Sequence, residues 1–232
     1  SKIMNKSVVI SGGSQGIGYS LVKFFLNKGF SVFTCARNEK GLSALSNDLN
    51  NSNLYTFQAD VSKKQEVLSF ADWVKSKVSQ IDVLINNAGY FEPGQIQYEA
   101  EGVLERQIET NLYSAYHLTR ALLPIIPKEG HIFNMCSVAS IVPYVNGGSY
   151  CISKFALLGF SKVLREELKE QKIKVTSILP GATLTNSWAG VDLPKERFID
   201  ADELAKTIFA AYDLGPSTVI EEILVRPMEG DV

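Results

Sequence analysis

Cysteine, histidine and long apolar runs are scarce in this sequence of 232 residues. The three cysteines, Cys35, Cys136 and Cys151, are an odd number without the spacing of metal ligands, which favours a reducing compartment. Two histidines also make a His-rich metal site improbable. Apolar runs such as Val8-Val9-Ile10 are too short for a signal peptide or a membrane span. We therefore expect a cytoplasmic protein with no metal site and no membrane partner.

An excess of charge of one sign is also lacking. The chain has 23 Lys and Arg against 25 Asp and Glu, a formal net charge of −2, and no basic block. This balance makes nucleic acid an unexpected partner. The length is normal for one layered α/β domain and is sufficient to bury a substantial core. We expect a single domain over residues 1–232.

Short apolar runs alternate with segments of helical spacing along the whole chain. The apolar runs predict strands over 7–11, 31–36, 54–58, 83–86, 130–135, 174–179 and 223–226. The helical spacing predicts helices over 16–28, 42–49, 62–78, 103–123, 149–171 and 201–213, with Ser62 as the N-cap of the third. This alternation predicts a Rossmann-type, doubly wound parallel sheet of about seven strands, with helices on both faces in a three-layer α/β/α arrangement. Such sheets bind ligands at the carboxyl ends of their strands.

A glycine-rich turn stands between the first predicted strand and the first predicted helix. Its sequence, Gly12-Gly13-Ser14-Gln15-Gly16-Ile17-Gly18, is a variant of the dinucleotide fingerprint. Glycines allow close backbone approach, and the following helix N-terminus offers free N–H groups and partial positive charge to a phosphate. The alternative is a tight turn with a purely structural role.

The end of the second strand indicates which dinucleotide is bound. NAD-binding folds usually have Asp or Glu there, where the carboxylate binds the ribose 2′-hydroxyl. This chain has Cys35-Ala36-Arg37-Asn38, without a carboxylate at Ala36, and Arg37 can pair with a 2′-phosphate. Although Glu39 lies nearby, we predict NADP(H) in preference to NAD(H).

Tyr150 and Lys154 are candidates for acid–base chemistry. They are four residues apart in a predicted helix, a spacing that puts both side chains on one face. A neighbouring cation favours the phenolate and lowers the pKa of a tyrosine, which is ordinarily about 10. The pair could therefore exchange protons near working pH. Alone it is a weak signal, because Tyr-x-x-x-Lys also occurs on solvated helix faces.

Several motifs in the right order make the chain resemble the short-chain dehydrogenase/reductase family, in the manner of its 3-oxoacyl-carrier-protein reductases and carbonyl reductases. The resemblance covers essentially the whole chain. The motifs are Ser11 to Gly18, Asp60-Val61, Asn86-Asn87-Ala88-Gly89, Asn111, Ser137, Tyr150 with Lys154, and Pro180-Gly181 followed by Thr183 and Thr185. Ser11 stands where Thr is commoner in the family.

The resemblance implies an oxidoreductase that transfers a hydride between NADP(H) and a carbonyl or secondary alcohol substrate. It implies that Tyr150 is the general acid/base and that Lys154 assists it and binds the nicotinamide ribose. It also implies that Ser137 binds the substrate oxygen and that Asn111 holds a water leading from Lys154 to solvent. The implied cofactor contacts are Gly12, Ser14, Gln15, Gly16, Ile17, Gly18, Arg37, Asp60, Val61, Asn87, Ala88, Gly89, Tyr150, Lys154, Pro180, Gly181, Thr183 and Thr185.

Each polar residue also has a purely structural interpretation. Asn86 and Asn87 can tie strands together through amide hydrogen bonds, and Asn111 can be a satisfied core amide. Ser137 can be an ordinary loop serine, and Asp60 can be a helix-entry residue. Cys136 and Cys151, which flank the candidate site, are interpreted as small buried hydrophobic residues.

The resemblance further implies a short substrate lid around residues 183–199 and a homodimer or homotetramer. The predicted helix after Tyr150 is apolar over most of its circumference, which indicates burial against the sheet and against a second subunit. Two other functions stay open: a catalytically silent dinucleotide-sensing regulator or scaffold, and an epimerase or dehydratase of the same fold. The intact set of four polar residues disfavours the first, and the short lid disfavours the second.

Overall fold

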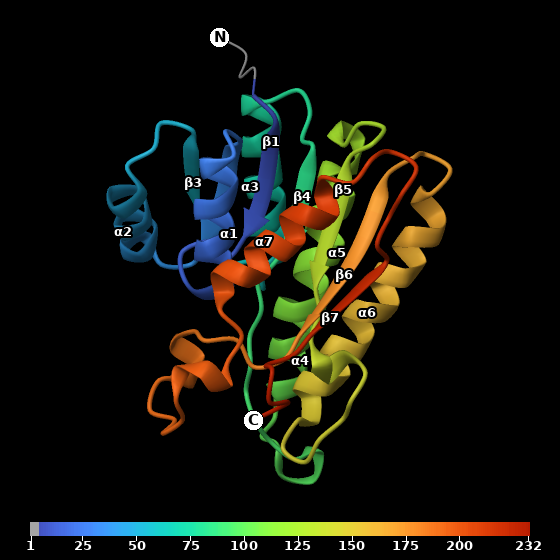
Figure 1. The fold of residues 1–232 in the computed structure, drawn as a ribbon. Coiled ribbons are helices and arrows are strands. Elements are labelled where there is room, and N and C mark those ends of the chain that lie inside the picture. The colour runs from blue at the N-terminus through green and yellow to red at the C-terminus, as the bar shows by residue number, and fades with distance from the viewer. Residues whose placement is uncertain (1–4) are drawn as a thin grey trace.

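The protein, here a computed structural model that describes residues 5–232, forms one parallel sheet of seven strands. The strand order is β3-β2-β1-β4-β5-β6-β7, and every neighbouring pair is parallel (Figure 1). The strands are β1 (Ser7–Ser11), β2 (Ser31–Ala36), β3 (Leu54–Gln58), β4 (Val83–Asn86), β5 (His131–Met135), β6 (Lys174–Pro180) and β7 (Glu222–Val225). The predicted fold class is confirmed.

Helices cover both faces of the sheet and complete the three layers. On one face, α1 (Gly16–Asn27), α2 (Glu39–Leu49) and α7 (Ala201–Tyr212) pack on one apolar core. On the other face, α3 (Lys64–Lys77), α5 (Ser114–Leu122) and α6 (Gly148–Leu168) pack on a second core, and α4 (Val103–Ile108) leads into α5. Short 3-10 turns are η1 (Ile96–Tyr98), η3 (Leu123–Ile125), η4 (Val138–Ser140), η5 (Asn186–Trp188) and η6 (Lys195–Arg197).

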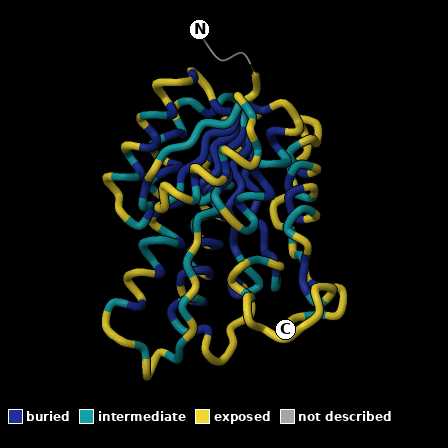
Figure 2. The backbone as a smooth tube through the Cα atoms, turned by 90° about the vertical axis from the view of Figure 1, so that its left-hand side faces the viewer, coloured by how far each residue is buried: buried dark blue, intermediate teal, exposed yellow. Residues whose placement is uncertain are grey.

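The central strands are rich in apolar residues because they are covered on both sides. In β1, Val8 and Ile10 belong to the core under α1 and α7, whereas Val9 belongs to the core under α3 and α5. All residues of β1, β4, β5 and β6 are buried, so the buried positions gather in the middle of the molecule (Figure 2). Among the strands of residues 5–232, only β7, at one sheet edge, alternates exposed and half-buried residues. This is why continuous apolar runs predicted the strands well.

The predicted continuous helix over 103–123 is wrong in its middle. A π-helical turn, η2 (Glu109–Tyr113), separates α4 from α5 and contains Asn111. The Asn111 amide bonds to the backbone of Tyr90 and to the side chain of Ser153, which lie on other elements. Such π turns occur often at functional sites. Helical periodicity carries no signal for these distant contacts.

Two predicted helix starts also differ from the structure. Asn38 caps α2, since its Oδ1 accepts the backbone N–H groups of Lys40 and Gly41, and the helix therefore begins at Glu39 rather than at residue 42. Ser62 is not the N-cap of α3; Lys63 occupies that position. The backbone N–H and the hydroxyl of Ser62 both donate to Asp60 Oδ1, so Ser62 closes the turn after β3 instead.

The order of the strands determines where a ligand can bind. The chain leaves β1 toward β2 on one side of the sheet, and β4 lies on the other side of β1. The loop after β1 therefore leads to one side of the sheet and the loop after β4 leads to the other. Open α/β sheets bind ligands in the crevice between two such loops. None of the helices in residues 5–232 is long and apolar enough to cross a membrane.

Candidate active site

Ser11 joins the loops that follow β1 and β4. Its hydroxyl oxygen accepts the backbone N–H groups of Asn87 and Ala88, each at 3.0 Å. In return, Asn87 Nδ2 donates to the carbonyl oxygens of Ser11 and Gly12, each at 3.1 Å. These four bonds bring the predicted cofactor residues Gly12, Asn87 and Ala88 together.

The glycine-rich turn is as tight as the sequence predicts. Gly12 has a φ of +70°, in the left-handed region that favours glycine. A Cβ on Gly18 would lie 2.0 Å from the Gly12 carbonyl oxygen, so no larger residue fits there without movement of the turn. Gln15 occupies the N-cap position of α1, but its side chain accepts no hydrogen bond from the first N–H groups of the helix. A turn of this shape can receive a phosphate on backbone N–H groups.

Arg37 and Ser14 lie beside this turn, beyond the end of β2. Arg37 is exposed, and its backbone carbonyl accepts a bond from Gln58 Nε2 at 3.0 Å. Ser14 lies against the start of α2: if Gly41 had a Cβ, that atom would lie 3.5 Å from Ser14 Oγ. Within residues 5–232 no carboxylate forms an ion pair with the Arg37 guanidinium. The guanidinium can therefore meet an anion from solvent.

Asp60 and Val61 follow β3 in a closed turn. Besides its bonds from Ser62, Asp60 donates its backbone N–H to the Glu66 carboxylate. Val61 is buried in the core under α3. The Asp60 carboxylate is thus held by its own turn.

Lys154 is buried, although it carries an ammonium group. Its side chain is on α6, and Nζ donates to the carbonyl oxygen of Met135 at the end of β5, at 2.9 Å. Nζ also lies 5.8 Å from the centre of the Tyr150 ring. Because a buried charge is costly unless it is bonded, these contacts fix the ammonium at the carboxyl end of the sheet.

Asn111 lies next to Lys154 and is itself buried. Its Oδ1 accepts the Tyr90 N–H at 2.7 Å, and its Nδ2 donates to the Tyr90 carbonyl and to Ser153 Oγ, each at 2.9 Å. Ser153 Oγ in turn donates to the Tyr150 carbonyl at 2.7 Å. A Cβ on Gly89 would lie 3.4 Å from Asn111 Oδ1 and 3.7 Å from Lys154 Nζ. Hydrogen bonds therefore connect Asn111, Ser153 and Tyr150, and the Lys154 ammonium lies near this group.

Ser137 caps the short helix η4 directly after β5. Its Oγ accepts the Ala139 N–H at 3.0 Å, while Ser140 Oγ accepts the Ser137 N–H at 3.1 Å. This reciprocal pair fixes the backbone at Ser137. No hydrogen bond within residues 5–232 joins Ser137 or Arg37 to the group of Tyr150 and Lys154.

Two aromatic residues, Phe91 and Tyr144, lie near Tyr150. Phe91, which follows β4 and is 48% exposed, meets the Tyr150 ring edge-on with ring centres 4.8 Å apart. Burial raises the pKa of Tyr144 to about 12, with a further contribution from the neighbouring Tyr150. Tyr144 therefore stays protonated and uncharged at neutral pH.

The segment after β6 returns across the glycine turn. The Gly181 N–H donates to the Val225 carbonyl at 2.7 Å, next to the paired residues Pro180 and Val225. Thr183 is buried and forms a parallel bridge with Ile199, which closes residues 183–199 into a loop. A Cβ on Gly16 would lie 3.3 Å from the Thr185 methyl group. The start of this loop therefore contacts the turn that opens α1, next to Ile17.

Burial keeps the thiols of Cys35 and Cys136 protonated at neutral pH. Burial raises the pKa of the Cys136 thiol to about 11 and that of Cys35 to about 12. Cys151 is buried as well. Thiols with raised pKa values are poor nucleophiles at neutral pH.

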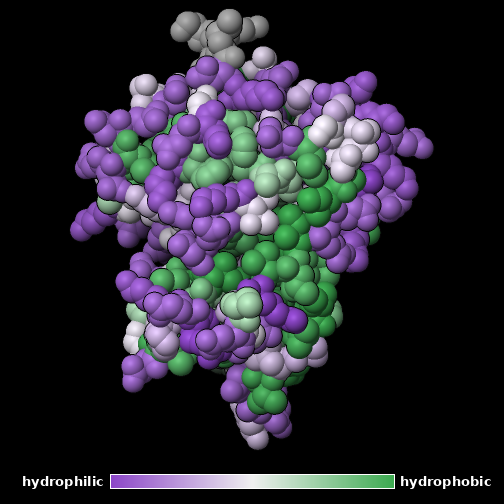
Figure 3. Space-filling view, viewed as in Figure 1, coloured by the Kyte–Doolittle hydropathy of each residue, from purple (hydrophilic) through white to green (hydrophobic). Residues whose placement is uncertain are grey.

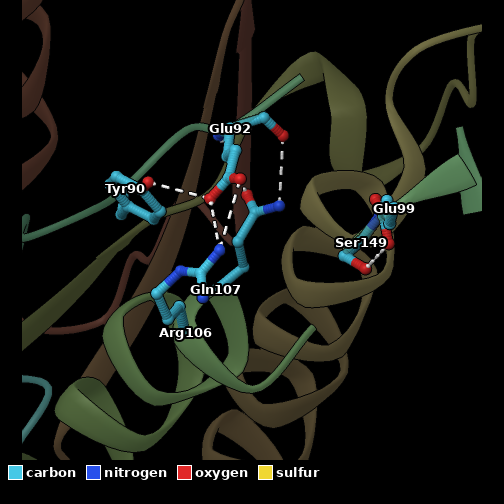
Figure 4. Close-up of polar contacts among 6 residues, drawn as sticks. All are labelled: Tyr90, Glu92, Glu99, Arg106, Gln107 and Ser149. Carbon is cyan, nitrogen blue, oxygen red and sulfur yellow. Dashed lines mark hydrogen bonds and ion pairs between the residues drawn. The ribbon is translucent and has the colours of Figure 1, made fainter. Parts of the chain in front are cut away.

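Sequence reasoning missed two residues that support this group. Ser153, one residue before Lys154, links Asn111 to Tyr150, and its only sequence signal is its place inside the Tyr-x-x-x-Lys motif. Glu99 binds the first turn of α6 from a distant loop, and nothing in the local sequence distinguishes it from other surface carboxylates (Figure 4). Neither residue could be found without the fold.

The sequence also matches a known family. The family model described as short chain dehydrogenase matches residues 6–195. A sepiapterin reductase of Chlorobaculum tepidum is 31% identical over 180 residues, which cover 76% of this chain and 74% of the relative. An uncharacterised oxidoreductase of Staphylococcus epidermidis is 29% identical over 230 residues, which cover 98% of this chain and 99% of the relative.

Solved structures have the same fold. The X-ray structure of an alcohol dehydrogenase from the archaeon Thermococcus sibiricus, complexed with 5-hydroxy-NADP, superposes with a TM-score of 0.90. The two chains are 24% identical, and the match covers 98% of each. At this identity the likeness establishes the fold, including the arrangement of strands around β1 and β4.

Proposed function

The chain belongs to the short-chain dehydrogenase family of NAD(P)-dependent oxidoreductases, and on this premise we propose that it transfers a hydride between NADP(H) and a carbonyl or secondary alcohol substrate. The observation that carries the proposal is the buried ammonium of Lys154 beside Tyr150. A buried cation at the carboxyl end of a parallel sheet is costly in stability and is therefore best explained by chemistry.

Tyr150 is the proposed general acid/base. During reduction its hydroxyl gives a proton to the carbonyl oxygen, and during oxidation it takes the proton from the alcohol. Lys154, held by Met135, stabilises the phenolate that remains after proton transfer. Phe91 packs edge-on against the Tyr150 ring beside this pair.

Ser137 and Asn111 have supporting roles in the proposal. The Ser137 hydroxyl binds the substrate oxygen and steadies the developing charge. Asn111 lies in the π-helical turn η2, a kind of turn that occurs often at functional sites. Its proposed role is to support a water that carries a proton from Lys154 toward solvent.

The residues after β1, β3, β4 and β6 fit a nicotinamide dinucleotide, which supplies the hydride when bound. Glycine at Gly18 leaves the turn free of a Cβ, and α1 offers N–H groups that Gln15 does not cap. We assign the phosphate contacts to the turn and the adenine side to Asp60 and Val61. The remaining contacts are assigned to the loop after β4, at Asn87, Ala88 and Gly89, and to Pro180, Gly181, Thr183 and Thr185 after β6.

We propose NADP(H) in preference to NAD(H) because of Arg37. Its exposed guanidinium stands beyond β2 and beside Ser14, with no carboxylate at Ala36 to bind a ribose 2′-hydroxyl. Charge-assisted, bidentate bonds from Arg to phosphate are among the stronger polar contacts.

We propose that residues 183–199 form the substrate lid of a single domain. The loop is tied at its base by Thr183 and Ile199, while Leu184, Val191 and Leu193 are exposed and apolar. A loop fixed at both ends with apolar side chains on its surface can close on a substrate. These side chains lose exposed area when they meet an apolar substrate.

We further propose a homodimer or homotetramer. On α6, Ile152, Phe155 and Val163 are exposed, and on the neighbouring α5 Tyr116 is exposed as well. Apolar side chains also gather over the β6–β7 side of the molecule (Figure 3), where Leu224 of the edge strand is 48% exposed. Exposed apolar patches of this kind mark protein interfaces.

One experiment tests the reaction. NADPH consumption is followed by absorbance against a panel of ketones, aldehydes, quinones, pteridines and 3-oxoacyl thioesters; the sepiapterin reductase relative makes the pteridines a reasoned member of the panel. Turnover of any member supports the oxidoreductase proposal. Tight cofactor binding with no turnover across the panel and in the oxidative direction would favour the silent dinucleotide sensor instead.

A further inference from the structure

Glu99 caps the helix that carries Tyr150, although it lies some fifty residues away in the chain. Its Oε1 accepts the backbone N–H of Ser149 at 2.8 Å, and its Oε2 accepts the Ser149 hydroxyl (Figure 4). Ser149 is buried and directly precedes Tyr150. The carboxylate therefore holds the first turn of α6 next to the proposed acid/base.

The helix has no cap of its own at this end. Gly147 is the N-cap and makes no side-chain bond. Gly148 has a φ of +43°, and a Cβ there would lie 2.2 Å from Glu99 Oε1 and 2.5 Å from the Gly94 carbonyl oxygen. The close approach of the Glu99 carboxylate thus requires glycine at Gly148. A negative charge at a helix N-terminus, bonded to its free N–H groups, stabilises that turn.

Glu99 belongs to a segment that is fastened to the site at its other end. We call residues 90–102 the strap. Tyr90 is bonded to Asn111, and the buried Gln107 bonds both backbone groups of Glu92, at 3.2 and 3.3 Å. Glu92 also accepts from Tyr90 and forms an ion pair with Arg106 at 3.2 Å (Figure 4).

The strap also touches the loop that leads into α6. The Gly94 N–H donates to the Asn146 carbonyl at 2.9 Å, and Gln95 Nε2 donates to Asn146 Oδ1 at 3.1 Å. Between its two fastened ends, the strap holds Phe91 edge-on against Tyr150. Two residues of the strap therefore act on Tyr150: Phe91 packs against its ring, and Glu99 binds the backbone of the preceding residue, Ser149.

We propose that Glu99 is a positioning residue for the reaction, because it holds the first turn of α6 and thereby sets the distance between the Tyr150 hydroxyl and the Lys154 ammonium. This inference rests on the proposed function of Tyr150. Lys154 is fixed independently by Met135, so loosening the first turn moves Tyr150 and leaves the cation in place. Misplacement of a reacting group by about 1 Å can cost on the order of 100-fold in rate.

The test compares Glu99→Ala, Glu99→Gln and Ser149→Ala with the wild type. Glu101→Ala is the matched control, since Glu101 is exposed and forms no ion pair or side-chain hydrogen bond within residues 5–232. We expect Glu99→Ala to lower kcat about tenfold or more, to leave the Kd for NADPH within about twofold, and to shift the pH profile of kcat to more alkaline pH. Glu99→Gln keeps an oxygen acceptor for the Ser149 N–H and should recover most of the activity.

A kcat and a pH profile of Glu99→Ala that match those of Glu101→Ala would overturn the proposal. If Glu99→Ala does not fold, Ser149→Ala decides, because it removes only the hydroxyl bond: a smaller loss of kcat with the same alkaline shift supports the proposal, and wild-type behaviour refutes it. If the wild type turns over no substrate, the proposed function fails separately. The role of Glu99 is then tested by ultraviolet titration of the tyrosines, in which the difference from Tyr150→Phe gives the contribution of Tyr150. An identical Tyr150 titration in the wild type and in Ser149→Ala refutes the positioning role.

Discussion

Replacing His131 should remove part of the acid sensitivity of the fold. His131 is fully buried in β5, where burial, followed by the nearby charge of Lys174, lowers its pKa from 6.5 to about 3. Thr176 Oγ1 donates to the Ile220 carbonyl and must therefore accept from His131 Nε2, at 2.7 Å. Nδ1 has no partner within residues 5–232. The ring is thus neutral, with its proton on Nε2, and a second proton would have no acceptor.

The sign of the effect follows from proton binding. Below the unfolded pKa of about 6.5 the unfolded chain binds a proton at His131 and the folded chain does not, so the free energy of unfolding falls as pH falls, down to the folded value of about 3. One pKa unit corresponds to about 1.4 kcal/mol, so the loss between about pH 7.5 and about pH 5 is about 2 kcal/mol. This is a large share of the stability of a typical domain.

The assay is urea unfolding of the wild type and of His131→Gln at both pH values. Gln keeps an amide donor near the position of Nε2 and does not titrate, so its loss of stability on acidification should be smaller by about 2 kcal/mol. His117→Gln is the control, because burial lowers the pKa of His117 but the ring is only partly buried. Protein concentration is held constant, since association would add to the measured stability. If the free energy of unfolding depends on pH equally in the wild type and in His131→Gln, the assignment of a neutral, buried His131 ring is refuted.

Four further predictions follow from the site and the surface. Tyr150→Phe should lower kcat by about 100-fold or more with NADPH binding retained, because the proton donor is lost while the glycine turn is intact; near-normal turnover would contradict the assignment. Arg37→Ala should reduce the preference for NADPH over NADH by about tenfold, and a wild type that prefers NADH by tenfold would contradict the NADP proposal. Gly18→Ala should weaken cofactor binding and lower Tm, because the new Cβ would lie 2.0 Å from the Gly12 carbonyl oxygen; unchanged affinity in calorimetry would speak against the tight turn. Light scattering should give a dimer or tetramer that dissociates on Phe155→Glu, since Phe155 is 44% exposed on α6, whereas a monomeric wild type would rule out the proposed assembly.

The sheet could be predicted from the sequence almost strand for strand. A strand covered on both faces is rich in apolar residues, so runs such as Val8-Val9-Ile10 identify it without any tertiary information. The same holds for the glycine turn, whose residues follow one another in the chain. Both features depend on residues that are close together in the sequence, so local sequence patterns predict them.

The support of Tyr150 could not be predicted in the same way. Asn111 lies in a π-helical turn whose bonds reach Tyr90 and Ser153, and Glu99 binds Ser149 across fifty residues. Such bonds depend on how the elements pack, and the residues involved look like ordinary surface or helix residues in the sequence. The predicted N-cap of α3 is wrong for a related reason, because the Ser62 hydroxyl donates its hydrogen bond to Asp60 instead of taking part in a helix cap.

The neighbours of β1 have a consequence for synthesis of the chain. In the sheet Val8 pairs with Val32 on one side and with Val83 on the other, so the second partner is translated some fifty residues after the first. A nascent chain that ends before β4 can assemble only β3, β2 and β1, with the apolar β1 as an unpaired edge. Open edges of this kind invite pairing with other chains, and long-range parallel pairing is slow. Ribosome-bound fragments that end near residue 80 should therefore depend most on chaperones.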